Sequence, residues 1–405
     1  MGANTHSIAT ICVMILTVIA ATPATISNDD SLLRDLPKSL EDFGTKLYSN
    51  IAKRSAQKNI IFSPFSIETS LAMIRLGATG QTADEIDNAL NLKFSNGERL
   101  ANYFEQILST YLNGDLLQLA NNIYAEEKLE LRDQFNVLLA KHFFASGENV
   151  NFTQNIKAAE KINSWVAAKT SQLINDLVSA EDLDENTRLL LLNAIYFKDE
   201  WARPFIGPRT QPKKFYVDAT NYVNVNLMVT FGDFLYGKID YLDATALEMP
   251  YKNSDLYMLV ILPNSRDGLD DLRIKLQSYS LREIRENMVE TKVLVEMPRF
   301  KTEYKIELNE ILKGLGVERM FSHADLEKMI NSKEVLQVTK FLHKAIIHVN
   351  EFGTEASAAT GIGASATSAV IVPEIETKFV VDHGFFYKIV NSDGIEFFEG
   401  SQSDF

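Results

Sequence analysis

The stretch Val349-Asn-Glu-Phe-Gly-Thr-Glu-Ala-Ser-Ala-Ala-Thr360 lies near the end of a chain of 405 residues. From Gly353 to Val370 the sequence carries one charged side chain, Glu355, and no aromatic residue, Lys or Arg. Apolar runs typical of strands lie on both sides, at Val335 to Val349 and at Lys378 to Val390. A loop of small side chains is therefore expected between two buried strands.

The composition is that of a globular protein. Hydrophobic residues make up 46% of the chain and charged residues 23%. Length alone suggests more than one domain, but no Pro-, Gly- or Ser-rich linker divides the sequence, so we expect a single domain. The formal net charge of -14 repels phosphate backbones and anionic headgroups. We therefore expect no nucleic-acid partner, no membrane binding and no heparin site.

The first 24 residues are typical of a cleaved secretory leader. Ile8 to Ala21 forms an apolar run, and small residues follow as far as Ala24. The segment lacks the usual Lys or Arg, which leaves a missed start or a membrane anchor as alternatives, although the run is short for a membrane span. We expect a signal peptide over residues 1–24 and a secreted, extracellular domain over residues 25–405.

Two further features depend on this export. The only cysteine, Cys12, lies inside the leader, so the mature chain would have neither a disulfide nor a thiol nucleophile. Asn151-Phe-Thr153 is the only glycosylation sequon, which makes Asn151 the candidate for glycan attachment.

The first half of the chain is predicted to be mainly helical. Apolar residues recur at intervals of three and four from Leu100 to Leu112, and Thr82 and Glu85 have the spacing of a capping box. A second helical stretch is expected to place one set of apolar residues on a single buried face. These residues are Ile156, Ile162, Trp165, Val166, Leu173 and Ile174.

The second half is predicted to be rich in strands. Several apolar runs are bounded by Asn, Gly, Asp or Pro, and most show no alternation of apolar and polar residues. A large sheet covered by the N-terminal helices is the expected arrangement. The runs are Leu189 to Phe197, Tyr257 to Pro263, Val293 to Phe300, Val335 to Val349 and Lys378 to Val390.

Motifs of ordinary active sites are weak in this chain. Gly361 to Ala366 has the GxGxxA spacing, but the residues that follow are β-branched and do not open a helix for a pyrophosphate. Asp382-His383 is not accompanied by a GxSxG nucleophile elbow. His343 and His348 do not have the spacing of a zinc site. We expect no cofactor, no metal and no enzymatic activity.

With its flanks, the opening stretch resembles the loop hinge of the serpin family, in which a Glu and one variable residue precede Gly-Thr-Glu and a run of alanines ending in Thr. Other blocks in the expected order extend the resemblance over most of the chain from about Leu40. They are Asn59 to Ile67 with Gly77 to Gly80, Ile162 to Val166, Leu192 to Lys198 with Trp201, Glu248 to Tyr251, Pro298 to Lys301, His343 to Ala345 and Phe379 to Phe385.

The resemblance implies a mixed α+β serpin fold. This is a single domain with three β-sheets, about nine helices and an exposed reactive-centre loop, here about residues 351–373. It also implies that Ser63, Ser66, Asn193 and His343 hydrogen-bond to one another beneath the point where the main sheet opens. Trp201 is implied at the top of that opening.

The resemblance further implies inhibition of a serine protease by a suicide-substrate reaction. The protease would form an acyl-enzyme with the loop, and the cleaved loop would enter the main sheet as a new strand. Because alternate side chains of a strand face opposite ways, Thr354, Ala356, Ala358 and Thr360 would turn inward, and all are small. The implied hinge comprises Glu351, Gly353, Thr354, Glu355, Ala356, Ser357, Ala358, Ala359 and Thr360.

The reactive bond is less closely defined. Counting forward from Glu351 by the family spacing indicates Thr367–Ser368, whereas counting back from Phe379 indicates Val370 or Ile371. Gly361 and Gly363 weaken strand propensity in the distal loop and depart from the family pattern.

The absence of Lys and Arg from the loop disfavours a trypsin-like protease and favours an elastase-like one, with chymotrypsin-like and subtilisin-like proteases as alternatives. We expect a monomer. The competing hypothesis is a serpin-fold carrier or storage protein that does not inhibit any protease.

Overall fold

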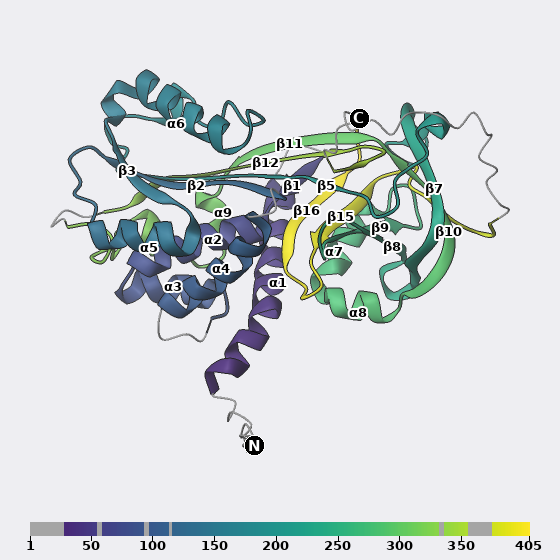
Figure 1. Cartoon of the computed structure of the whole chain (residues 1–405), viewed down its shortest axis with the longest axis horizontal. Coiled ribbons are helices and arrows are strands. Elements are labelled where there is room, and N and C mark those ends of the chain that lie inside the picture. The colour runs from purple at the N-terminus through teal and green to yellow at the C-terminus, as the bar shows by residue number, and fades with distance from the viewer. Residues whose placement is uncertain (1–27, 55–58, 93–96, 113–115, 332–335, 355–374) are drawn as a thin grey trace, which may run out of the picture.

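The computed structural model describes residues 28–54, 59–92, 97–112, 116–331, 336–354 and 375–405. Within these residues the chain forms nine α-helices and two hydrogen-bonded networks of strands, which confirms the predicted mixed α+β class. The helices α2 to α5 lie on one side of a seven-stranded sheet, and α6 lies on the other side (Figure 1). The helices are α1 (Asn28–Arg54), α2 (Pro64–Gly77), α3 (Gly80–Ala89), α4 (Gly97–Leu112), α5 (Asp133–Phe143), α6 (Asn155–Lys169), α7 (Leu269–Lys275), α8 (Leu281–Glu286) and α9 (Asn309–Gly314).

Helix α2 is the central helix of the molecule. Every residue from Pro64 to Gly77 is buried, and Ser63 caps its start by accepting a hydrogen bond from the backbone N–H of Ser66. Pro64 suits the first helical position because its missing N–H would have no partner there. The local sequence therefore fixes where this buried helix begins.

The helical predictions were partly right. The stripe on α4 is buried as predicted. The capping box was wrong, because α3 begins at Gly80 and Thr82 lies within it, where its hydroxyl accepts a hydrogen bond from the backbone N–H of Asp325. The predicted face of α6 was also partly wrong, because Ile156 is exposed and the helix ends before Leu173.

The seven-stranded sheet carries the candidate site. Its order is β3, β2, β4, β12, β13, β5, with β11 paired to the opposite edge of β12. Strands β4 and β12 are parallel neighbours, paired from Val338 and Leu189 to Ile346 and Tyr196. The bounds are β2 (Leu117–Glu126), β3 (Ser146–Val150), β4 (Leu189–Phe197), β5 (Asp199–Glu200), β11 (Phe300–Glu307), β12 (Val338–Val349) and β13 (Gly353–Thr354).

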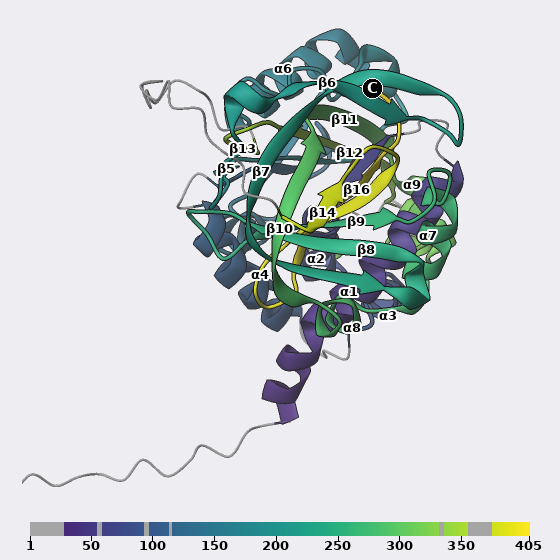
Figure 2. The ribbon, with the colours of Figure 1, turned by 90° about the vertical axis from the view of Figure 1, so that its right-hand side faces the viewer.

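The nine-stranded network contains two sections that share the long strand β7. The end of β7 pairs with β8, whereas its beginning pairs with β6 and its middle with β10 (Figure 2). Two of the three predicted sheets are thus joined by one continuous strand. The bounds are β1 (Ile60–Phe62), β6 (Gln211–Tyr216), β7 (Tyr222–Ile239), β8 (Ala244–Pro250), β9 (Tyr257–Pro263), β10 (Val289–Pro298), β14 (Thr377–Val380), β15 (Phe385–Val390) and β16 (Glu396–Gln402).

One of the predicted strands forms two separate strands in the structure. The apolar run at Lys378 to Val390 divides into β14, which pairs with β10, and β15, which pairs with β9 and β16. His383 lies in the break, where its ring nitrogens contact the Asp382 carboxylate at 2.8 Å and the Pro263 carbonyl oxygen at 2.7 Å. These contacts hold the chain as it passes from one section of the network to the other.

Two apolar cores hold these layers together. The larger one fills the space between the helices and both sheets. The smaller one lies between α6 and the seven-stranded sheet, where Ile162 and Val166 of α6 join Leu192 of β4 and Leu342 of β12 in one buried cluster. The layer formed by α6 is therefore packed on the sheet by a core of its own.

Candidate functional site

The hinge predicted from sequence begins at the end of β12 and turns back into the sheet. After Val349 the backbone N–H of Asn350 donates to the Gly353 carbonyl oxygen at 3.0 Å, which closes a tight turn. The Asn350 side-chain oxygen accepts from the backbone N–H of Phe352 at 2.9 Å. Strand β13 then lies between β12 and β5, antiparallel to both. The first residues of the loop thus already occupy a place in the seven-stranded sheet.

Gly353 is required by the close approach of β5. A Cβ atom at this position would lie 2.0 Å from the Asp199 carbonyl oxygen and 2.8 Å from the Glu200 Cα. Both are backbone atoms, so no side-chain rotation could relieve the overlap. The glycine of the hinge therefore has a steric function.

Thr354 is the one residue of the predicted inward set that the structure describes. Its side chain is fully buried, and its hydroxyl shares a 2.7 Å hydrogen bond with the hydroxyl of Tyr251. Burial raises the pKa of Tyr251 well above its usual value. The Tyr251 ring stacks on Trp201, with ring centroids 4.5 Å apart. A small side chain bearing a hydroxyl fits this closed space.

Glu351 fastens the hinge to the top of the other sheet. Its carboxylate pairs with Arg299, in the link between β10 and β11, and accepts a 2.8 Å hydrogen bond from Thr210. Burial favours the neutral acid, but these partners outweigh it and hold the pKa of Glu351 below its usual value. The carboxylate is therefore charged at neutral pH.

Trp201 lies at the same end of the sheet. It is fully buried, and its indole N–H donates to the Asn350 carbonyl oxygen at 3.0 Å. Its backbone N–H donates to the Phe352 carbonyl oxygen at 2.8 Å, so the hinge turn contacts this residue through both the side chain and the backbone.

The four residues assigned beneath the opening lie together. Asn193 of β4 and His343 of β12 face each other in the sheet and are joined by a hydrogen bond between the His343 Nδ1 and the Asn193 side-chain oxygen. The His343 Nε2 accepts from the backbone N–H of Ser63 at 3.2 Å. The Asn193 amide donates to the Ser66 hydroxyl at 2.6 Å. Nδ1 therefore carries the proton of a neutral imidazole.

Burial determines the charge of His343. The residue is fully buried, and desolvation lowers its pKa to about 3. Its partners are a backbone N–H and an amide oxygen, so no carboxylate stabilises the cationic form. The strands β4 and β12 are thus joined at this point by a neutral network.

Sequence reasoning missed two members of this cluster. Asn121 of β2 accepts a hydrogen bond from the Asn193 amide at 2.8 Å, and Ser70 of α2 accepts another at 3.0 Å. Asn121 is paired directly with Asn193 in the β2–β4 ladder. The available signal was a polar residue inside each of two apolar strands.

The remaining predicted residues are less connected or lie outside the described ranges. Asn151 is partly exposed, caps a short helical turn and donates to the Glu127 carboxylate at 2.8 Å. The hinge from Glu355 to Thr360, the reactive-bond candidates Thr367, Ser368, Val370 and Ile371, and the signal peptide over residues 1–24 lie outside the described residues.

The described residues contain no group of three His, Cys, Asp or Glu side chains arranged to hold a metal ion. None of the helices among them has the length and apolar content needed to cross a membrane.

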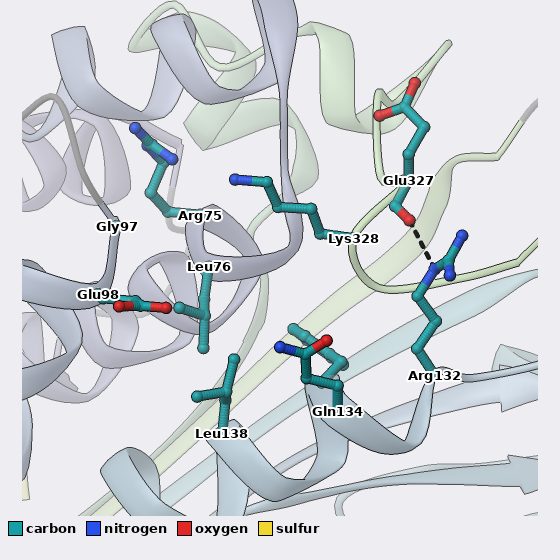
Figure 3. Close-up of a pocket in the computed structure, with 10 residues that line it drawn as sticks. Arg75, Leu76, Gly97, Glu98, Arg132, Gln134, Leu138, Glu327 and Lys328 are labelled. Atoms are coloured by element: carbon teal, nitrogen blue, oxygen red, sulfur yellow. Dashed lines mark hydrogen bonds between the residues drawn. The ribbon is translucent and has the colours of Figure 1, made fainter.

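A cavity of about 390 Å³ lies away from the hinge, between α2, α4, α5 and residues 327–328 (Figure 3). Arg132 closes one side through a 2.8 Å hydrogen bond from its Nε to the Glu327 carbonyl oxygen. The lining mixes the cations of Arg75, Arg132 and Lys328 with the carboxylates of Glu98 and Glu327. The charges of the lining therefore select neither an anion nor a cation.

Comparison with known proteins finds relatives that match most of the described region. The family model described as "Serpin (serine protease inhibitor)" matches residues 38–403. Alaserpin of Manduca sexta is 32% identical over 392 residues, which cover 96% of this chain and 98% of the relative. Neuroserpin of Gallus gallus is 33% identical over 364 residues, covering 87% of this chain and 88% of the relative. The solved structure of cleaved Serpin 42Da has a TM-score of 0.82 at 37% identity, covering 92% of this chain and 99% of that one.

Proposed function

The chain belongs to the serpin family, and from this premise we propose that it inhibits a serine protease as a suicide substrate. The protease would attack a bond in the loop that follows β13 and form an acyl-enzyme. The cleaved loop would then enter the seven-stranded sheet between β4 and β12 and carry the bound protease with it.

The position of Thr354 is the single observation that carries this proposal. Val349 and Thr354 are paired across β12 and β13, and both side chains are buried. The hinge therefore already forms the beginning of a strand beside β12, at the end where β4 and β12 separate. Insertion would extend an existing pairing and would not need a new nucleus.

Continuing this register gives each hinge residue a partner on β12. Ala356 would face Ile347, Ala358 would face Ala345, and Thr360 would face His343. Ile347 and Ala345 belong to the larger core, and His343 is fully buried against Ser63. A buried, unpaired charge on this side would cost about 3–5 kcal/mol. The small side chains of the hinge are therefore those that this position tolerates.

The other face of the inserted strand would also be covered. In the same register Ser357 would face Ile346 and Gly361 would face Leu342, both of which belong to the smaller core under α6. Glu355 would face His348, which is only partly buried. This parity lies on the side of the sheet that α6 covers. Gly361 and Gly363, which depart from the family pattern, are suited to this covered side.

The same proposal includes the target protease and the location of the protein. We place the reactive bond at Thr367–Ser368 or at Val370 or Ile371, and the loop composition favours an elastase-like protease over a chymotrypsin-like or subtilisin-like one. Secretion by a signal peptide over residues 1–24, glycosylation of Asn151, a monomeric state and independence of heparin complete the proposal.

Incubation with an elastase-type serine protease followed by a denaturing gel tests the inhibitory step. A complex that survives boiling in detergent is the expected result. Clean cleavage of the loop without any complex would favour the alternative of a serpin-fold carrier or storage protein. Mass spectrometry of the released peptide would identify the reactive bond.

Thr354→Arg tests the role assigned to the hinge. The buried charge should slow insertion so that the protease deacylates, which converts the inhibitor into a substrate and lowers complex formation by tenfold or more, the ratio that corresponds to about 1.4 kcal/mol. Glu355→Arg, a neighbour of opposite parity, is the matched control and should still form the complex. Equal behaviour of the two variants would contradict the assignment.

A further inference from the structure

The connection between α6 and β4 crosses the sheet above the line where β4 and β12 meet. It comprises residues 170–188 and includes a short turn of helix, Ala180–Asp182. Leu177, Val178 and Leu183 of this connection are buried in the smaller core together with Leu342 of β12. The connection continues directly into β4, so it is covalently tied to one side of that line.

Two lysines on the other side of the line bind the connection. The Asp182 carboxylate accepts a 3.0 Å hydrogen bond from Lys340 of β12 and a 3.3 Å hydrogen bond from Lys305 of β11. The backbone N–H of Ser179 also donates to Asp182, at 2.9 Å, and fixes the carboxylate in the turn. Burial opposes ionisation, but the hydrogen bonds of Ser179 and Lys340 outweigh it and lower the pKa of Asp182 to about 2.

A second ion pair repeats the arrangement further along β12. Lys344 pairs with Asp176 of the connection, and its side chain is only 3% exposed. It also pairs with Glu303 of β11 at 2.6 Å. Lys344 faces Lys305 directly in the β11–β12 ladder, an arrangement of like charges that is unfavourable unless acidic groups lie close by.

Entry of a new strand would break both contacts. Adjacent strands lie about 4.8 Å apart, so insertion between β4 and β12 would move β12 away from β4 by about that distance. The two aspartates belong to the β4 side, and their lysines belong to the β12 side. Ion pairs that now span about 3 Å would exceed hydrogen-bonding distance once the strands separate.

We propose that Asp182 and Asp176 act as an ionic latch, defined by their pairs with Lys305, Lys340 and Lys344, that holds the β4–β12 line closed and limits the rate of loop entry. They are positioning residues and do not contact the protease. This inference rests on the proposed function in so far as loop entry is the step that is limited. The latch itself is a property of the uncleaved protein.

Hydrogen exchange of the uncleaved protein tests the latch without any protease. Asp182→Asn removes the charge while keeping an acceptor for Ser179. It should increase the exchange rate of peptides that cover β4 and β12 by about 2- to 10-fold, the range expected for two partly exposed ion pairs. Glu181→Gln removes the same charge one residue away, at an exposed position, and should leave the rate unchanged.

Lys340→Met removes the cation of β12 that pairs with Asp182. Alone, this variant should also increase the exchange rate. Combined with Asp182→Asn, it should give a fold increase in exchange rate that is smaller than the product of the two single fold increases, because both variants remove one shared contact. Equal exchange in Asp182→Asn and Glu181→Gln, or fully multiplicative effects in the double variant, would overturn the latch.

The inhibitory readout separates this inference from the proposed function. If faster exchange in Asp182→Asn is accompanied by fewer protease molecules turned over per complex formed, both hold. If exchange becomes faster but neither the variant nor the wild type forms a stable complex with elastase-like, chymotrypsin-like or subtilisin-like proteases, the latch holds and the inhibitory proposal fails.

Discussion

At the scale of single residues, the neutral His343 makes stability depend on pH. Its pKa is about 3 in the folded protein, whereas an unperturbed histidine titrates near 6.5. Between these values the unfolded chain binds a proton that the folded protein does not, so this residue lowers stability by about 1.4 kcal/mol for each unit of falling pH.

His343→Gln should remove that dependence. We expect the variant to be less stable than the wild type at pH 7, because the hydrogen bonds to Ser63 and Asn193 change, and the deficit should shrink as the pH falls to 4. Denaturant unfolding of both proteins at pH 7, 5.5 and 4 measures this difference in the free energy of unfolding. A deficit that is constant across this range would contradict the burial argument.

A second cluster of titratable side chains should lower the stability of the fold as the pH rises, which is the opposite of the effect of His343. Lys388 of β15 pairs with Glu396 of β16 and lies 3.7 Å from Glu399, and all three side chains are buried. Burial raises the pKa of Glu396 to about 7 and that of Glu399 to about 8, although Lys388 opposes both shifts. Among the described residues Glu68 of α2 has no cationic partner, and burial raises its pKa well above the usual value.

Glu68→Gln should therefore stabilise the protein at high pH. The folded protein keeps the Glu68 proton at pH values where the unfolded chain has lost it, so the stability from this proton is complete below about pH 4.5 and declines as the pH rises. The variant should match the wild type near pH 4 and exceed it by about 1 kcal/mol or more at pH 8.5. Urea unfolding at both values measures this, with the exposed Glu290→Gln as the control. A variant that is weaker at pH 8.5 would show that Glu68 is ionised in the fold.

At the scale of elements, sequence pattern predicted most clearly those strands that are buried on both faces. The runs Leu189 to Phe197 and Tyr257 to Pro263 coincide with β4 and β9, because a strand covered on both faces is continuously apolar. The run at Lys378 to Val390 was misjudged, because two consecutive strands with apolar residues cannot be told from one long strand by composition. The break depends on the tertiary contact between His383 and Pro263, which no local pattern contains.

The sequence also identified some residues of the candidate site and missed others. Ser63, Ser66, Asn193 and His343 were found through motif resemblance, and their hydrogen bonds make physical sense of it. Asn121 was not found, because the available local signal, a polar residue inside a strand, does not show which residue of another strand is its partner. The contact between Glu351 and Arg299 joins distant parts of the chain and could not be read from either segment.

The short strand β13 provides a prediction at this scale. Gly353→Ala places a methyl group within 2.0 Å of the Asp199 carbonyl oxygen, so β13 should leave the sheet and the bond between Thr354 and Tyr251 should be lost. In a Trp165→Phe background, Trp201 is the only tryptophan, and its emission should shift to longer wavelength as water reaches it.

Gly207→Ala is the matched control, because a Cβ atom there would have no neighbour within 4 Å in the described part of the chain. The control should retain the emission of the parent protein. Identical spectra for the two alanine variants would show that β13 tolerates a side chain at position 353 and that the close approach of β5 is not maintained in solution.

At the scale of the whole molecule, the proposed function requires that the intact protein is not in its most stable form. Cleavage of the loop would free the strand to enter between β4 and β12. Each additional backbone hydrogen bond contributes about 0.5–1.5 kcal/mol, so about ten residues give on the order of 5–15 kcal/mol. The cleaved protein should then melt roughly 10 °C or more above the intact one.

Calorimetry of the intact protein and of the protein cleaved in its loop provides this comparison. Cleaved Thr354→Arg is the control, because it carries the same nick but should gain little stability. If nicked and intact wild type melted together, no strand would have entered the sheet.

The layer formed by α6 has a practical consequence. This helix and its connection rest on the sheet through a small core separate from the main one, and local units of a fold can open at a lower free energy than the whole molecule. A preparation kept well below its melting temperature could therefore expend its inhibitory capacity slowly, as intact loops slip into the loosened sheet. Its unfolding curve would then improve with age while its potency declined, so shelf life should be judged by titration against protease and not by thermal scans.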